Sequence, residues 1–444
     1  MQELSLVVET IDCRVAMVDP SSKAVLALQM SDRTTLPHVQ LSRRTRFAKQ
    51  LTSAIYATWG LQVLILDSLK TGSSSTNCIV VALLIAGMPG PQFSMLPAER
   101  LIGCVLSNQE AGPLFEMLEG KRANPFSRLG WIDDAISWIV TATGQKLSSK
   151  RQIEQWNFGG EFALLRFRMD EGGCYWLKAT GKPNKHEYDI TVCLSELYSD
   201  FLPPLVATRK EWNAWLTKEF GEPFADLPPA DAMTCAATNF ATLQLETING
   251  VEMLLSAGAF DQRLRTLREH IDPIFRFLTD AMTRQRSTTV PPLGGERLQE
   301  LAILVTNACD RMASLRISDT LLHNDLNAGN ILYDGRRCVF TDWSEAAVGN
   351  PFLACERLCR LNVNHGEVVR TAYRKLWIEQ VGEAGIREAF TLAPLLDVFT
   401  YLYGRGDWIA RENHPQYLES RARSLARHMD RIAHTCTPSE VLCQ

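Results

Sequence analysis

The chain has 444 residues, of which 46% are hydrophobic and 22% charged, with a net charge of −4 and a pI near 6.1. A chain of this length exceeds one ordinary domain and can bury more than one core. Because its charge balance creates no global positive field, we expect no nucleic-acid partner and no attraction to an anionic membrane.

The sequence carries no signal that predicts export or membrane insertion. Its first residues, MQELSLVVETIDC, include two early glutamates and no basic segment, unlike a secretory signal. The longest apolar run, 78–88, falls short of the ~20 residues that span a bilayer, and predicts a buried strand. Twelve cysteines occur without CxxC pairs, and we expect Cys355 and Cys359 to be core thiols rather than zinc ligands. The expected compartment is the cytoplasm.

The first ~120 residues alternate segments that are typical of strands and helices. CRVAMVD (13–19) and AVLALQM (24–30) predict a hairpin joined by PSSK. The stretch 43–61 predicts an amphipathic helix that ends near Gly60, with its basic residues, among them Arg46 and Lys49, on a solvated face. QVLILDSL (62–69) and CIVVALLIA (78–86) predict two further strands.

This order of a hairpin, a helix and the pair Gly60-Leu61 resembles a Nudix fold. In that resemblance, Ala54, Ala57 and Thr58 occupy the positions of metal-binding glutamates. The resemblance therefore implies a catalytically empty domain, which we expect to serve in self-association or docking.

A linker rich in Pro and Gly precedes a predicted helix, WIDDAISWIVTAT (131–143), and then a change of period to strands. Within 155–181, apolar residues alternate with arginines, which is typical of a strand, and DEGG (170–173) predicts a turn into the next strand. Together they predict an antiparallel meander. The stretch 186–202 predicts a helix and 214–222 another strand. From about residue 230 the pattern is mostly helical.

The stretch LLHNDLNAGNILYDGRRCVFTDW (321–343) places polar groups at the ends of two short apolar runs. A hairpin of this length folds back on itself, so Asn330 and Asp342 can face each other across a gap for one hydrated cation. Amide and carboxylate oxygens suit Mg²⁺. Asp325 lies just outside this pair, placed to accept a proton from a hydroxyl. The alternative is that these Asp and Asn residues are ordinary turn residues.

The pattern H-N-D-L-N-A-G-N-I-L followed by T-D-W resembles the catalytic loop and metal-binding aspartate of kinase-like phosphotransferases. It is most similar to the aminoglycoside phosphotransferase and choline-kinase-like family, over about residues 150–434. The resemblance implies that Asp325 is the catalytic base, that Asn330 and Asp342 hold Mg²⁺, and that His323 braces the loop. Asn350 stands where that family usually has aspartate.

The same resemblance implies a nucleotide site upstream, built from a Gly-rich turn, a strand lysine, a helix glutamate and a hinge. Lys178 would neutralise the α/β-phosphates and Glu187 would hold it, with Glu196 as the alternative partner. The hinge would use backbone groups near 217–220 for adenine. The expected nucleotide-binding residues are Gly159, Gly160, Lys178, Glu187, Glu219 and Phe220.

We therefore predict an α+β fold, a bilobal kinase-like fold with an antiparallel-sheet N-lobe and a mostly helical C-lobe, preceded by a small α/β domain. The expected divisions are 1–120, 121–222 and 223–444. The expected activity is Mg²⁺-dependent transfer of the γ-phosphate of ATP or GTP to a hydroxyl of a small molecule (sugar, nucleoside, amino alcohol or antibiotic). The alternatives are a nucleotide-binding regulatory module that has lost catalysis, and a protein kinase.

Two asparagines in the loop separate it from a protein kinase. Protein kinases usually have Arg where Asn324 stands, and Ser/Thr kinases have Lys where Asn327 stands. The short run after Asp342 also lacks Ala-Pro-Glu, which favours a small-molecule acceptor. Candidate acceptor contacts, all equally compatible with core or helix-surface roles, are Tyr401, Tyr403, Asp407, Trp408, Glu412 and Glu419. The sequence leaves the acceptor, the choice of nucleotide and the oligomeric state open.

Overall fold

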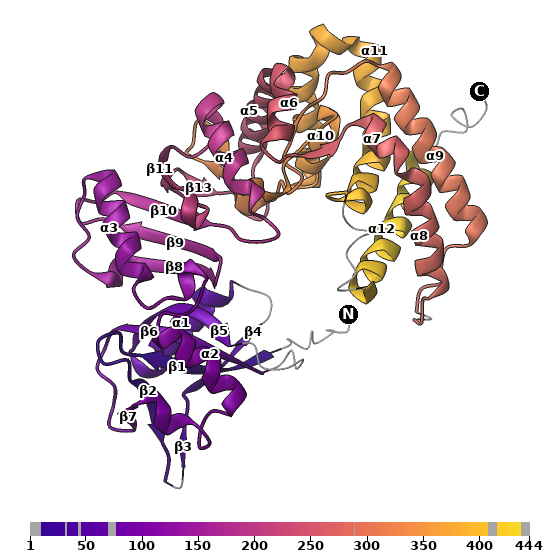
Figure 1. Cartoon of the computed structure of the whole chain (residues 1–444). Helices are drawn as coiled ribbons and strands as arrows, with labels where there is room; N and C mark the ends of the chain where they lie inside the picture. The colour runs from indigo at the N-terminus through magenta and orange to yellow at the C-terminus, as the bar shows by residue number, and fades with distance from the viewer. Residues whose placement is uncertain are drawn as a thin grey trace. The chain divides into compact units, whose positions relative to one another are not determined.

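The computed structural model describes residues 10–31, 33–42, 46–69, 77–287, 289–406 and 415–436. The chain divides into two compact units, Met1–Tyr188 with Pro204–Glu219, and Asp189–Pro203 with Phe220–Gln444. The first contains the two large sheets and the second is mostly helical (Figure 1). The predicted α+β class, with strands early and helices late, is confirmed, whereas the domain divisions at 120 and 222 stay predictions.

The amino-terminal part of the first unit is a mixed seven-stranded sheet of order β3-β2-β1-β6-β5, with β4 along β1 and β7 along β2. The predicted hairpin is confirmed, since Met17 of β1 lies opposite Leu26 of β2. Strand β6 runs parallel to β1 and antiparallel to β5. The strands are β1 Thr10–Val18, β2 Val25–Gln29, β3 Thr34–Thr35, β4 His38–Ser42, β5 Gln62–Leu69, β6 Asn77–Ala86 and β7 Phe93–Leu96.

In the described part of this unit, three helices accompany the sheets: α1 (Phe47–Trp59), α2 (Asn108–Leu118) and α3 (Trp131–Thr143). Helix α1 ends as predicted at Gly60, whose φ of 67° is a left-handed conformation that glycine adopts without strain. The order of hairpin, helix and Gly-Leu pair agrees with the order predicted from the sequence, but the likeness to a Nudix fold stays a prediction.

The described basic residues at the start of α1, Arg46 and Lys49, are exposed as expected, and they also contact an aromatic ring. Arg43 and Arg44 lie outside the described residues. The Lys49 ammonium lies 3.9 Å from the ring centroid of Trp156, and the Arg46 guanidinium 5.1 Å from it. Both cations therefore contact an aromatic face of β8, a favourable electrostatic arrangement.

The second sheet of this unit is antiparallel, with the order β11-β12-β10-β9-β8. It confirms the predicted meander, because Leu165, Phe167 and Leu177 are buried while arginines alternate with them on β9. The strands are β8 Ile153–Gly159, β9 Phe162–Arg168, β10 Cys174–Ala179, β11 Leu205–Arg209 and β12 Ala214–Lys218.

The two sheets of the first unit share one hydrophobic core. A single buried cluster contains Val81 and Leu83 of the first sheet together with Leu165 of the second. The Gln155 side chain of β8 accepts a hydrogen bond from the Ile65 N–H (2.6 Å) and donates one to the Ile65 carbonyl (2.8 Å). This buried amide therefore satisfies the free edge of β5 in place of another strand.

The second unit is built on helices around a large core that includes Trp343, Phe352 and Trp377. Helix α11 is interrupted at Gly382, whose φ of 73° is not helical. Helices α7 and α8 meet at His270. The helices are α4 His186–Leu197, which begins in the first unit, α5 Ala230–Thr247, α6 Val251–Ser256, α7 Leu264–Glu269, α8 Ile271–Thr283, α9 Gly295–Ser314, α10 Pro351–Cys359, α11 Gly366–Tyr403 and α12 Pro415–Cys436.

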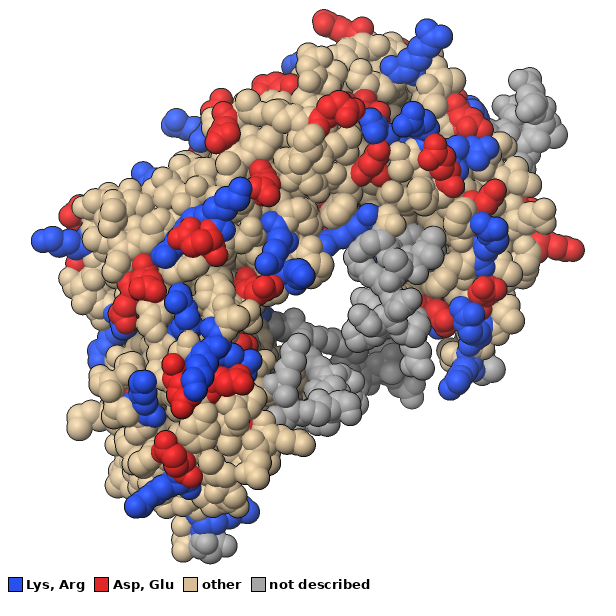
Figure 2. Space-filling model, in the orientation of Figure 1, with Lys and Arg blue, Asp and Glu red and all other residues tan. Residues whose placement is uncertain are grey.

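Basic and acidic side chains are interspersed over the face drawn in Figure 2. No helix among the described residues is long and apolar enough to cross a membrane. Cys355 and Cys359 are buried in α10, as expected for core thiols. Within the described ranges, no three His, Cys, Asp or Glu side chains gather as metal ligands.

Candidate active site

The polar segment singled out in the sequence forms a short hairpin in the second unit. Strand β15 (Thr320–Leu322) leads into a loop, followed by β16 (Ile331–Tyr333) and β17 (Cys338–Phe340). Ile331 lies opposite Phe340, and the Thr341 N–H donates to the Asn330 carbonyl at 3.0 Å. The predicted fold-back is confirmed, because it brings the start of the first strand to the end of the second.

Asn330 is buried and connects directly to Asp325. Its amide nitrogen donates to the Asp325 carbonyl oxygen at 2.9 Å and to the Asp325 carboxylate Oδ2 at 3.0 Å. Since these contacts use the donor side of the amide, the Oδ1 atom is left as the acceptor that could bind a cation.

Asp342 follows β17 in a left-handed conformation, with φ 67° and ψ 63°. A non-glycine residue in this region costs of order 1 kcal/mol, and such strain is concentrated at functional sites. The Ser344 hydroxyl donates to Asp342 Oδ1 at 3.2 Å. An amide oxygen from Asn330 and a carboxylate from Asp342 form a donor set that fits Mg²⁺, which keeps several water ligands and takes phosphate oxygens.

His323 ties the loop to the end of the hairpin. The ring is fully buried, its Nε2 lies 2.7 Å from the Thr341 carbonyl, and its centroid lies 4.5 Å from that of Trp343. Because a carbonyl only accepts, Nε2 carries a proton. This is the bracing arrangement that the resemblance implied.

A buried arginine of α10 is hydrogen-bonded to the same loop. Arg357 donates to Oδ1 of Asn324, to Oδ1 of Asp397 (2.7 Å) and to the Thr400 hydroxyl (2.7 Å). Asn324 is left-handed, with φ 58°, and Asp397 also pairs with Arg360 at 2.5 Å. Sequence reasoning did not predict this network, because Arg357 on α10 and its acceptors on α11 lie far along the chain from Asn324 and show no local spacing that would indicate contact.

The protein around Asp325 raises the pKa of its carboxyl, although part of the side chain still reaches solvent. The largest cause is the loss of solvation beside the loop. The hydrogen bonds from Asn327 and Asn330 oppose this increase, while the negative charges of Asp342 and Glu345 add to it. A carboxylate with a raised pKa binds a proton more readily, as a general base requires.

The first unit contains the predicted lysine–glutamate pair. Lys178 of β10 lies 2.5 Å from Oε1 of Glu187 in the first turn of α4, and Glu187 is 1% exposed. The Lys178 ammonium also lies 5.6 Å from the ring centroid of Trp215. Of the two glutamates that the sequence offered, Glu187 rather than Glu196 forms the pair.

Gly159 and Gly160 form the turn between β8 and β9, as predicted. A Cβ atom on Gly160 would lie 2.3 Å from the amide nitrogen of Asn124, and the Gly160 carbonyl accepts from the Phe126 N–H at 3.3 Å. Close packing against the linker therefore explains this glycine by itself. Its contact with phosphate stays a prediction.

The two predicted hinge residues have side-chain partners within their own units. Glu219 pairs with Arg166 at 2.6 Å and accepts from the Trp176 indole N–H at 3.0 Å. Phe220 lies under the Arg337 guanidinium, 5.0 Å from it. Backbone contacts of these residues with adenine stay predictions.

The candidate acceptor contacts are only partly described. Asp407, Trp408 and Glu412 lie outside the described residues. The Arg357 guanidinium lies 5.0 Å from the Tyr401 ring centroid, whereas Glu419 pairs with Arg284 at 2.9 Å. Glu419 is therefore occupied by an ion pair with the residue that follows α8.

No protein-family model matches the chain, and no curated protein matches it either. Several solved structures match the chain. A macrolide 2′-phosphotransferase from Brachybacterium faecium is 15% identical over 66% of this chain and 98% of its own, with a TM-score of 0.42. An ethanolamine kinase from Plasmodium vivax is 12% identical over 75% of this chain and 96% of its own, with a TM-score of 0.45. The protein APH(2″)-IIa, in a ternary complex with streptomycin and ATP, is 15% identical over 67% of this chain and 97% of its own, with a TM-score of 0.43. A functional assignment therefore depends on the side chains of the site itself.

Proposed function

We propose that this protein is a phosphotransferase that moves the terminal phosphate of ATP or GTP to a hydroxyl of a small molecule, with Mg²⁺. The observation that carries the proposal is the hairpin that joins Asp325, Asn330 and Asp342. In it, the Asn330 amide donates to Asp325 and leaves its oxygen for a cation. A base beside an oxygen-ligand pair is the arrangement that phosphoryl transfer needs.

Each residue of the site would have a separate role in the transfer. Asp325 would orient the acceptor hydroxyl and take its proton as that oxygen bonds to the γ-phosphorus and the bond to the β-bridging oxygen breaks. Asn330 and Asp342 would hold Mg²⁺, which when bound neutralises charge on the phosphate oxygens. Lys178, fixed by Glu187 at 2.5 Å, would offer a further positive charge to the phosphates.

The segment after Asp342 supports a small acceptor rather than a protein. It passes directly into β18 (Ala347–Gly349) and then α10 from Pro351, almost entirely buried. Asn324, which stands where protein kinases have the arginine that reads a phosphorylated segment, is hydrogen-bonded to the buried Arg357 instead.

A screen of alcohols for the mass of one added phosphate, with ATP, GTP and Mg²⁺, tests the proposal. On an acceptor found in this way, Asp325→Ala should lose turnover by about 10²-fold or more. Asp334→Asn is the matched control, because this exposed aspartate lies in the same hairpin and caps its turn. Full turnover by the Asp325→Ala protein would contradict the assignment.

The second candidate is a nucleotide-binding regulatory module without useful catalysis. It is favoured by the packing of Gly160 against Asn124 and by the core that joins the amino-terminal sheet to the second sheet. Nucleotide binding without turnover on any acceptor would select it. The cytoplasm, and a docking or self-association role for the amino-terminal sheet, remain the expected compartment and partner surface.

A further inference from the structure

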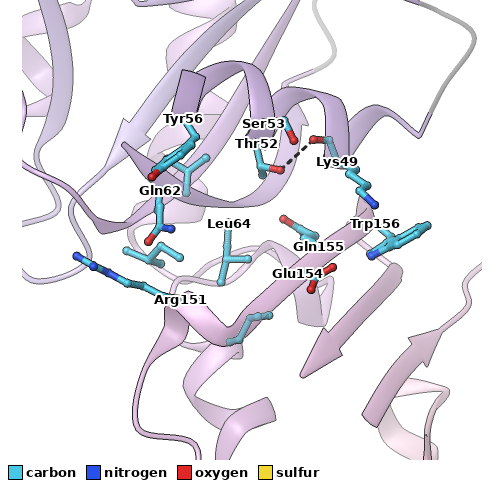
Figure 3. Close-up of a pocket in the computed structure, with 13 residues that line it drawn as sticks. Lys49, Thr52, Ser53, Tyr56, Gln62, Leu64, Arg151, Glu154, Gln155 and Trp156 are labelled. Atoms are coloured by element: carbon cyan, nitrogen blue, oxygen red, sulfur yellow. Dashed lines mark hydrogen bonds between the residues drawn. The ribbon is translucent and has the colours of Figure 1, made fainter. Parts of the chain in front are cut away.

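A cavity of about 320 Å³ lies between α1 and β8 in the first unit (Figure 3). None of its lining residues belongs to the proposed active site. Small-molecule sites typically begin at about 300 Å³, so the cavity has room for one compact ligand.

The cavity has one polar wall and an apolar floor. Four residues of α1 at helical spacing, Lys49, Thr52, Ser53 and Tyr56, form the wall. The floor is made by branched aliphatic side chains of the two sheets, which shield a ligand from water. These floor residues are Val63, Leu64, Ile85 and Ile153.

The charge of the lining is positive. Glu154 is the one carboxylate among the described lining residues, and it already pairs with Arg166 (2.9 Å) and Arg168 (3.7 Å). Arg151 is exposed, and within the described residues its guanidinium has no ion-pair or hydrogen-bond partner. An unpaired guanidinium beside an apolar floor is suited to a planar carboxylate, which it can bind through two parallel N–H···O bonds.

The same end of the cavity holds a polar atom without a partner. Oε1 of Gln62 is buried and receives no hydrogen bond in the described part of the chain. Figure 3 shows the Gln62 amide between the Tyr56 hydroxyl and the Arg151 side chain. A buried acceptor without a donor costs about 1–3 kcal/mol, so a ligand that brings a hydroxyl or amine would relieve it.

Two other lining residues, Glu154 and Trp156, connect the cavity to the end of β12. Trp156 packs edge-to-face on Trp176 at 5.3 Å, and the Trp176 indole N–H donates to Glu219. Arg166 bridges Glu154 of the cavity to the same Glu219. A ligand that moves Trp156 or Glu154 therefore acts on the side chains that fix Glu219.

We propose that this cavity is a regulatory site for a small carboxylic acid with an apolar body and a hydroxyl or amine next to the carboxylate. Arg151 and Tyr56 bind the carboxylate, Gln62 accepts from the neighbouring donor, and the aliphatic floor contacts the body. Occupation of the site changes nucleotide affinity through Glu219. This last step rests on the proposed function, whereas the binding site does not.

Binding is tested on the full chain by calorimetry or ligand-observed NMR with 3-phenyllactate as the probe. Hydrocinnamate lacks the hydroxyl, and 3-phenylpropan-1-ol lacks the charge, so both should bind more weakly than phenyllactate. Arg151→Ala should weaken phenyllactate about tenfold or more, the loss of a charge-assisted pair. Ser53→Trp, at an exposed helix position, should block the cavity.

The control is Arg33→Ala, an exposed arginine of the same unit away from the cavity, which should bind like the wild type. Unchanged thermal unfolding of each variant confirms that it folds. No binding of phenyllactate, equal binding of the neutral alcohol, or full affinity in Arg151→Ala would each overturn the site.

The coupling is tested by measuring ATP affinity with and without saturating phenyllactate. A change of at least twofold that disappears in Arg151→Ala supports regulation. A change that survives in Arg151→Ala means that the probe acts at the nucleotide site, and overturns it. An unchanged ATP affinity while the probe binds also overturns regulation. Failure to bind ATP or GTP at all refutes the proposed function and leaves the carboxylate site standing.

Discussion

The buried Arg357 offers a demanding test of how the loop around Asp325 is supported. Substitution by methionine keeps most of the side-chain volume and removes the charge. Three hydrogen bonds disappear, to Asp397, Thr400 and Asn324. Among the described residues, the carboxylate of Asp397, which is fully buried, would then retain only the ion pair to Arg360, whose side chain is 38% exposed.

Removing one partner of a buried ion pair typically costs about 3–5 kcal/mol, because a desolvated charge remains. The surviving pair to Arg360 compensates part of this loss, so we expect Arg357→Met to lower the free energy of unfolding of the helical unit by about 3 kcal/mol. Urea unfolding, read by hydrogen exchange in peptides of α10 and of the loop 321–345, measures the change in that unit.

A double variant separates the charge from the packing. Arg357→Met with Asp397→Leu removes both buried charges, while Arg360 can turn to water, so the pair should be more stable than Arg357→Met alone by about 1 kcal/mol or more. A single variant within about 0.5 kcal/mol of the wild type, or a double variant that loses the sum of both singles, would refute the reasoning.

Four further predictions concern other sites. Lys178→Met should weaken ATP binding by about tenfold or more in a calorimetric titration, whereas Lys146→Met, an exposed lysine, should not. Asp342→Asn should raise the Mg²⁺ concentration for half-maximal turnover about tenfold, and an unchanged Mg²⁺ dependence would exclude it as a ligand. Gln155→Leu leaves both polar groups of Ile65 unsatisfied and should destabilise the first unit by about 2 kcal/mol in urea, with Gln109→Leu, at an exposed position of α2, as the control. Burial raises the pKa of Asp319 to about 6, so the folded state holds this proton more tightly and stability falls as the pH rises from about 4 to 6. Asp319→Asn should therefore exceed the wild type by about 1 kcal/mol at pH 7.5 and match it near pH 4 in urea unfolding.

Several elements of the fold follow from local sequence patterns. The helix 131–143 coincides with α3, and α1 ends at the glycine that the sequence marks as its terminus. These elements are predictable because their helical period and end residues lie within one short window. Strands β4 and β7 were not predicted, since each is short and becomes a strand only by pairing with β1 or β2.

The candidate site also has parts that the sequence predicts and parts that it does not. The sequence by itself determined the hairpin that joins Asn330 to Asp342, because turn chemistry and two short apolar runs set its register. It also identified Lys178, but could not choose between Glu187 and Glu196, which are both on one helix.

Only the tertiary structure decided which distant groups support and surround these residues. Arg357 and Asn324 come from separate elements, as do Gln155 and Ile65, and each contact forms because a buried polar group must find a partner that water no longer provides. The cavity beside Arg151 likewise exists only where α1 meets β8. Sequence patterns report local preference, whereas these contacts depend on which surfaces the packed core brings together.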